Sequence, residues 1–140
     1  MSVLDDDTIV DLLLQAWAES QAGTTDAHEE GGFILESPDG SLTVERWPQG
    51  SQNQIVVPPH PGGNRGNRII VATFHTHPNQ EPDFQQEPSL TDIRAVRNDP
   101  DLSRVEYEGE YVISRDAIYQ VRRDGTVATV AGTRAMFRTS

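Results

Sequence analysis

Two histidines separated by one residue lie at the end of an apolar segment. His75 and His77 follow residues 69–74, a nearly continuous apolar run typical of a central strand that is covered on both faces. Because side chains alternate along a strand, both imidazoles would project to the same side, with their Cα atoms about 6.6 Å apart. That separation suits two ligands of one metal ion, and Pro78 directly after them ends the predicted strand.

A third ligand is needed nearby, because catalytic zinc sites usually combine three protein ligands with a water molecule. Asp92 is a candidate, since it lies in the first turn of a helix predicted to begin at Ser89, soon after the strand ends. The same residues also fit an ordinary helix start, with Ser89 as N-cap and an acid three positions later, close to a capping box. Both interpretations stay open from the sequence, as do surface or stacking histidines at positions 75 and 77.

An acidic residue upstream completes a pattern. Glu29 and Glu30 precede Gly31 at the start of another predicted strand, and as neighbours they would face opposite sides of it. The combination of Glu-x-x-Gly entering a strand, His-Thr-His-Pro and Ser-x-x-Asp resembles the JAMM metalloproteases, also described as MPN-plus or JAB-domain proteins. The resemblance runs from about Glu29 to Asp92, and more loosely through residues 111–114. Of the two acids, Glu29 fits the Glu-x-x-Gly register.

This resemblance implies an active site. His75, His77 and Asp92 would be the zinc ligands, and the ion would lower the pKa of its bound water to about 7. Glu29 would take the proton of that water and later pass it to the leaving amine, acting as general base and then as general acid. Ser89 would donate a hydrogen bond to the oxyanion that forms at the amide carbonyl.

The resemblance also implies a function and a fold. The family cleaves peptide or isopeptide bonds next to ubiquitin-like C-termini, and some bacterial relatives act on small conjugates. We therefore expect a zinc-dependent peptidase or isopeptidase whose substrate is a peptide or a ubiquitin-like protein conjugate. A catalytically inactive MPN-type module that binds a protein partner is the alternative. The family fold resembles that of cytidine deaminases, a mixed β-sheet flanked by helices.

The connection between the two metal-binding motifs, residues 78–88, is longer than the family motif commonly has. We expect it to bulge outward as an exposed loop that brings Asp92 back to the histidines. Asp83 and Glu87 within this connection are spare carboxylates that could substitute for Asp92, although solvated loop acids are the simpler interpretation.

The remaining pattern predicts an α/β (α+β) protein with a single domain over residues 1–140. Apolar residues recur at helical spacing from 4 to 22 and from 89 to 97, and strand patterns bounded by turns lie between and after them. The predicted strands are residues 31–35, 42–47, 68–77, 110–114 and 117–121, with a weaker one near 126–130. Residues 48–67 are predicted to form a long loop with at most a short strand at 55–57. We expect a mixed sheet with helices packed on it.

Composition excludes several classes of protein. The chain has 22 acidic residues against 11 basic ones, all of them arginine, and its net charge of -11 disfavours nucleic acid as a partner. Without cysteine it has no disulfide, no thiol nucleophile and no Cys-type zinc site, such as deaminases use. No apolar run approaches the roughly 20 residues of a membrane span. We therefore expect a cytoplasmic protein without membrane contact, a monomer or weak homodimer.

Other charged residues are interpreted as surface features. His60 lies in the Gly- and Pro-rich loop and is expected to be an exposed histidine rather than a ligand. Arg122 and Arg123, before the Asp124-Gly125 turn, are expected to form a solvated charged face. The acidity of the chain also fits a host with a salty cytoplasm, because salt at molar strength screens self-repulsion over about 3 Å.

Overall fold

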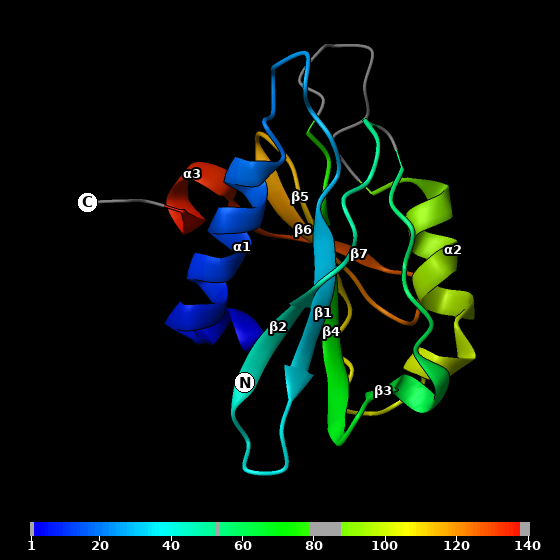
Figure 1. Ribbon diagram of the computed structural model, residues 1–140. Coiled ribbons are helices and arrows are strands. Elements are labelled where there is room, and N and C mark those ends of the chain that lie inside the picture. Colours follow the sequence, from blue (N-terminus) through cyan, green and yellow to red (C-terminus); the bar gives the residue numbers. More distant parts are fainter. Residues whose placement is uncertain (1, 53, 79–87, 138–140) are drawn as a thin grey trace.

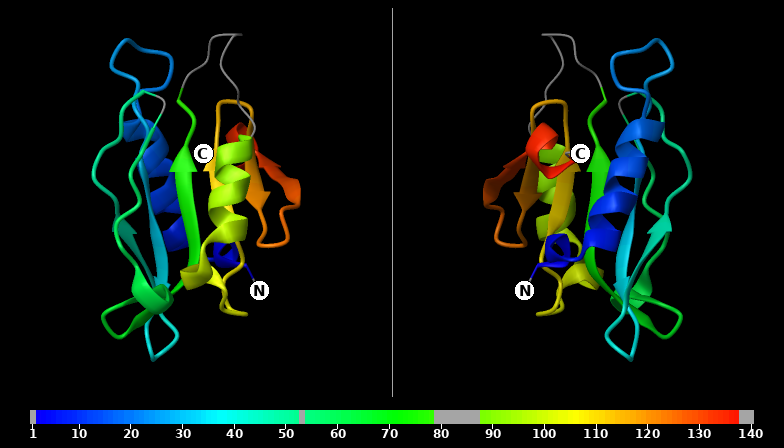
Figure 2. Two further views of the ribbon diagram at one scale, coloured as in Figure 1. Left: turned by 90° about the vertical axis from the view of Figure 1, so that its right-hand side faces the viewer. Right: turned by 90° about the vertical axis from the view of Figure 1, so that its left-hand side faces the viewer.

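A mixed β-sheet with helices on both faces forms the framework of the protein (Figure 1). The computed structural model describes residues 2–52, 54–78 and 88–137. Helix α1 (Asp7–Glu19) covers one face of the sheet and α2 (Leu90–Asn98) covers the other, as the two side views make clear (Figure 2). A short helix, α3 (Thr133–Met136), lies on the same side as α1. The expected mixed sheet flanked by helices is confirmed.

The sheet has seven strands, and its main path runs β2-β1-β4-β5-β6-β7, with β3 paired to β4 beside this path. The bounds of the strands are β1 (Gly31–Glu36), β2 (Leu42–Arg46), β3 (Asn64–Arg65), β4 (Arg68–Thr76), β5 (Glu110–Ile113), β6 (Ala117–Val121) and β7 (Val127–Gly132). Among the described strand pairs, β4 and β5 run parallel and the others antiparallel. The central position of β4 explains its continuous apolar sequence, because both of its faces are covered.

The predicted strands and both predicted helices are present, although the first helix begins at Asp7 and ends at Glu19, and the short helix α3 was not predicted. Residues 48–67 were expected to form a long loop with at most a short strand; residues 55–57 form none, and the short strand β3 lies further along the loop, after a 3-10 turn at Pro61–Gly63. The last strand, β7, extends two residues beyond the predicted 126–130. The strands β3 and β7 lie where the pattern of apolar residues is weak, so that pairing with a neighbouring strand decides their extent.

Apolar side chains fill a separate core on each face of the sheet. Under α1, the core includes Ile9, Leu13, Ile34, Phe74 and Tyr111, all of them at most 1% exposed. Under α2, it includes Phe33, Leu35, Val96, Val112 and Tyr107. Successive residues of β1 thus alternate between the two cores, which is the expected period of a strand, whereas Val71 and Ala72 of β4 both face the core under α1 at a break in the pairing register. The face under α2 is the one that carries the candidate site.

Helix α2 is anchored at its C-terminal end by a basic side chain. Arg123 donates hydrogen bonds from its guanidinium to the main-chain oxygens of Val96 and Asp99, where the helix ends. The expectation of a solvated face at this position is therefore wrong for Arg123, because the unpaired carbonyls of a helix C-terminus attract a cation. Arg122 is exposed, as expected.

None of the helices in the described part of the chain combines the length and apolar character that crossing a bilayer would require.

Candidate metal centre

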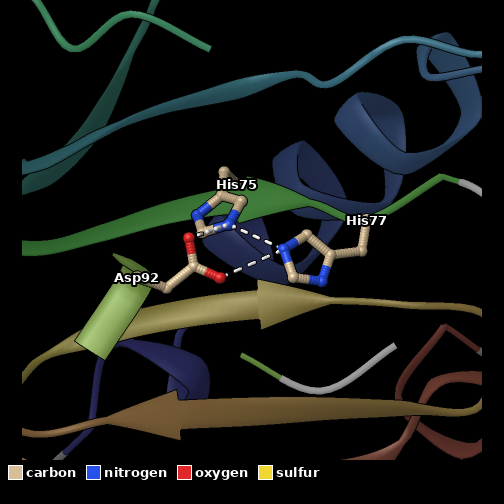
Figure 3. A group of neighbouring side chains, drawn as sticks. All are labelled: His75, His77 and Asp92. Carbon is tan, nitrogen blue, oxygen red and sulfur yellow. Dashed lines mark hydrogen bonds and ion pairs between the residues drawn. The ribbon is translucent and has the colours of Figure 1, made fainter. Parts of the chain in front are cut away.

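The side chains of His75, His77 and Asp92 converge where β4 ends (Figure 3). The two imidazole Nε2 atoms lie 3.1 Å apart. The Asp92 carboxylate contacts both, with Oδ1 at 3.4 Å from Nε2 of His75 and Oδ2 at 3.3 Å from Nε2 of His77. Each residue thus offers a donor atom to one point, and together they could hold a metal ion.

Two elements bring these donors together. His75 lies in β4 opposite Gly31 of β1 and Val112 of β5, so its side chain is on the face that α2 covers. Two residues later, His77 projects to the same side, as the period of a strand predicts. Asp92 enters from the first turn of α2, which begins above this end of the sheet. The predicted convergence of the three residues is therefore present in the fold.

The Asp92 carboxylate also caps its own helix. Its Oδ2 atom accepts a hydrogen bond from the Ser89 main-chain N–H at 2.8 Å, and the Ser89 hydroxyl oxygen accepts one from the Asp92 N–H at 3.0 Å. This is a capping box, the alternative that the sequence left open. The two interpretations are compatible, because a carboxylate has two oxygens and can accept several hydrogen bonds. The cap holds the carboxylate in position beside the histidines.

The register of β1 separates Glu29 from Glu30. Gly31 pairs with His75, so the residue two positions earlier, Glu29, lies on the histidine side, and it lines the same pocket. Glu30 points to the opposite face, where Arg46 donates to it at 2.5 Å. Both are buried, at 7% and 6% exposure. The structure thus places Glu29, and not Glu30, beside the candidate metal ligands.

A pocket of about 400 Å³ opens over these side chains. One wall comes from the long loop, through Gln52, Gln54, Ile55 and Val57, and the other from α2, through Thr91 and Ala95. The loop is tied to the site, since the Glu29 main chain donates to the Ser51 oxygen at 2.8 Å and accepts from the Gly50 N–H at 2.9 Å. The lining residues whose side chains can bind a metal ion, transfer a proton or donate a hydrogen bond to a substrate are Glu29, His75, His77, Ser89, Asp92 and Glu110.

Burial and neighbouring charges shift the pKa values of three side chains in the site. Burial raises the pKa of Glu29 above its ordinary value, and the two histidines only partly oppose this. Burial also acts to raise the pKa of Asp92, but hydrogen bonds from His75 and His77 outweigh it and hold that pKa far below its usual range. Burial lowers the pKa of His75, whereas Glu110 and Asp92 raise it, and the net shift is upward. Asp92 is thus kept ionised, as a metal ligand must be.

Sequence reasoning missed the role of Glu110. Its Oε1 atom lies 3.1 Å from Nδ1 of His75, and the residue is 7% exposed. The available signal was an acidic residue at the start of an otherwise apolar strand, where a buried carboxylate needs a partner. That partner became identifiable only when β5 was placed beside β4.

His60 is not the exposed histidine that was expected. Its side chain is 13% exposed, with Nε2 at 2.6 Å from Oδ2 of Asp99 and Nδ1 at 2.8 Å from the Pro58 oxygen. The ring also lies against Phe33, with centroids 5.4 Å apart. The loop composition favoured exposure, but Asp99 lies 39 positions away and its proximity could not be predicted. With Asp101, these residues form a second group that could hold a metal ion.

Asp83 and Glu87, the spare carboxylates of the connection, lie outside the described residues. Comparisons of the chain with protein-family models, with curated proteins and with solved structures found no match. The arguments for function therefore rest on the site itself and on the motifs of the sequence.

Proposed function

We propose that the protein is a zinc-dependent peptidase or isopeptidase whose metal is held by His75, His77 and Asp92. The observation that carries this proposal is the convergence of the donor atoms: the two Nε2 atoms lie 3.1 Å apart, and each lies within 3.4 Å of a different oxygen of the Asp92 carboxylate. Ligands at zinc bond lengths in a tetrahedron lie about 3.3 Å from one another. Two imidazole nitrogens and one carboxylate oxygen are also a donor set that zinc accepts, and a fourth position is left for a water molecule.

Glu29 supplies the acid-base chemistry in this proposal. When bound, zinc provides a Lewis acid and lowers the pKa of a water molecule on it to about 7. Glu29 lies in the same pocket and takes up the proton, which it later delivers to the nitrogen of the leaving amine. The raised pKa of Glu29 suits this task, because a carboxyl whose pKa lies closer to neutrality can both accept and release a proton.

Ser89 supplies the hydrogen-bond donor for the substrate carbonyl oxygen. The Asp92 N–H already occupies a lone pair of the Ser89 hydroxyl oxygen, at 3.0 Å, which orients the hydroxyl in the pocket. Its hydrogen is then available for the oxyanion that develops when the carbonyl is attacked. The capping box therefore positions a metal ligand and an oxyanion donor with one local structure.

The substrate class follows from the motifs and from the surface of the pocket. The JAMM resemblance favours a peptide or a ubiquitin-like protein conjugate, and the same resemblance favours a JAB/MPN fold of the cytidine-deaminase type. The described lining of the pocket contains carboxylates and neutral groups but no arginine, which disfavours a phosphate-bearing substrate such as nucleic acid. The pocket is lined by the loop that carries Gln54 and by helix α2, and we expect the substrate chain to bind between them.

Elemental analysis combined with a cleavage panel tests the proposal. The purified protein should contain about one zinc per chain and cleave at least one of a set of ubiquitin-like fusions and small peptide amides. The Glu29→Gln variant should keep the metal and lose about 100-fold to 10,000-fold in rate, the range of general-base catalysis. Glu36→Gln, at the other end of β1 and outside the pocket lining, is the matched control and should be fully active.

Absence of zinc binding, or an active Glu29→Gln variant, contradicts the proposal. Zinc binding without hydrolysis of any substrate, together with tight binding of a ubiquitin-like protein, would instead identify the inactive binding module.

A further inference from the structure

Glu110 is a buried acid in the site that the proposed mechanism does not use. It is 7% exposed and lines the pocket, and its Oε1 atom lies 3.1 Å from Nδ1 of His75. It is not itself among the donors that converge on one point, since the group whose ligand atoms lie within 4.8 Å of one another contains His75, His77 and Asp92. Glu110 therefore contacts the candidate ligand His75 at Nδ1, the ring nitrogen that does not face the other donors.

The sheet holds Glu110 in this position. In the parallel pair of β4 and β5, Glu110 lies opposite Thr73, and Thr73 is two residues before His75 on the same face. The preceding residue, Gly109, has a φ of 123°, and a Cβ there would collide with the Val121 carbonyl oxygen. The Gly109 oxygen in turn accepts from the Thr73 N–H at 3.2 Å. The start of β5 is thus fixed by main-chain contacts to β4 and β6.

The contact between Glu110 and His75 determines which imidazole nitrogen carries a proton. An ionised carboxylate only accepts hydrogen bonds, so Nδ1 of His75 must donate. A neutral imidazole has one N–H, and its other nitrogen then has a free lone pair. In His75 that nitrogen is Nε2, which lies 3.1 Å from Nε2 of His77 and 3.4 Å from Asp92. A metal ion bound at this nitrogen would displace the proton that it shares with Asp92, and the lone pair would then face the point where the other donors converge.

We infer that Glu110 is a positioning residue for the metal centre, which acts by holding His75 in the Nδ1–H form with Nε2 directed at the ion. The inference rests on the proposed function. Partners of this kind orient a ligating imidazole and increase its basicity. A carboxylate at this position also adds negative charge close to the ring that would hold a cation.

Zinc affinity provides the first measurement, by competition with a chromogenic chelator. Glu110→Ala removes both the acceptor and the charge and should weaken binding about 10-fold to 100-fold. Glu110→Gln keeps an acceptor oxygen and loses only the charge, so its affinity should lie between those of Glu110→Ala and the unchanged protein. Glu108→Gln is the matched control, because Glu108 bonds Tyr111 and the Val3 N–H, away from the histidines, and its zinc affinity should be unchanged.

The protonation of the ring provides a second measurement that needs no variant. In zinc-loaded protein labelled with ¹⁵N, the imidazole spectrum should show a proton on Nδ1 of His75. A proton on Nε2 instead, or equal zinc affinity of Glu110→Ala and the unchanged protein, overturns the role of Glu110 while leaving the proposed function intact. A wild-type protein without affinity for zinc overturns both. An equal loss of affinity in Glu108→Gln would show a general charge effect and also overturn the inference.

Discussion

The protein contains two groups of histidine and aspartate side chains with similar composition and different chemistry. The first, His75, His77 and Asp92, lies under a pocket at the end of β4. The second, which we call the loop clasp, consists of His60, Asp99 and Asp101 and joins the long loop to the segment after α2. Residue types alone do not distinguish the two groups, so the difference must lie in how their polar atoms are used.

In the loop clasp, hydrogen bonds within the protein occupy the polar atoms. Nδ1 of His60 lies 2.8 Å from the Pro58 oxygen and Nε2 lies 2.6 Å from Oδ2 of Asp99, so both ring nitrogens are engaged. The other oxygen of Asp99 accepts from the Asp101 N–H at 2.9 Å, and an oxygen of Asp101 accepts from the Gly62 N–H at 3.0 Å. The loop clasp therefore works as a structural contact.

In the first group, by contrast, the donor atoms lie against one another under the pocket. Nδ1 of His75 is engaged by Glu110, and one carboxylate oxygen of Asp92 by the Ser89 N–H, while both Nε2 atoms and Asp92 face one another. The comparison teaches that a metal site requires donors whose remaining lone pairs converge. Counting histidines and acids identifies both groups, whereas the pocket over His75, His77 and Asp92 separates them.

The largest expected effect tests the difference between the candidate metal ligands and the loop clasp directly. His77→Ala removes a proposed metal ligand and should weaken zinc binding more than about 100-fold. This loss exceeds the one expected for substitution of a residue that contacts a ligand and not the metal. His60→Ala removes one histidine from the loop clasp and should leave zinc affinity unchanged while lowering the melting temperature. Equilibrium competition for zinc and thermal unfolding of both variants measure the two effects. Equal zinc affinity in His77→Ala and the unchanged protein would contradict the distinction.

A smaller effect separates the two tasks of Ser89. Ser89→Ala and Ser89→Gly both remove the hydroxyl, so each should lower kcat about 100-fold, as loss of one oxyanion donor does. Their stabilities should differ, because alanine at an N-cap costs about 1 kcal/mol and glycine only a few tenths. Activity assays and urea unfolding of the pair measure both quantities. Activity that followed stability across the pair would argue against a direct contact with substrate.

The smallest effect is a pH dependence of the loop clasp. Burial lowers the pKa of His60, but the Pro58 oxygen and Asp99 raise it, and the net pKa lies above its ordinary value. A raised folded-state pKa means that the stabilisation is fully present below about pH 6.5, the unfolded value, and is lost as pH rises through the folded value. For a partly exposed pair this contribution is at most about 1 kcal/mol.

Urea unfolding of the unchanged protein and of His60→Gln, followed from pH 5 to pH 9, measures this contribution as the difference between the two curves. The difference should shrink with rising pH. A difference that stayed constant or grew would mean that His60 and Asp99 do not form an ion pair in the folded protein.

Much of the local structure could be predicted because it depends on neighbours in the chain. The strand that ends in His75 and His77 follows from its apolar run, and the shared direction of the two imidazoles follows from the strand period. The start of α2 follows from Ser89 and Asp92, whose capping box is a contact over three residues. These elements were confirmed because short-range sterics and hydrogen bonds determine them.

Contacts between distant segments were decided only by the tertiary structure. The choice of Glu29 over Glu30 as the acid beside the histidines depends on the register of β1 against β4, since a shift by one residue would exchange their faces. The contact of Glu110 with His75 spans 35 positions, and that of His60 with Asp99 spans 39. The sequence by itself therefore determined the donor types and their local spacing. Packing of the sheet and helices determined which lone pairs face one another, because side-chain direction at long range depends on strand pairing and burial.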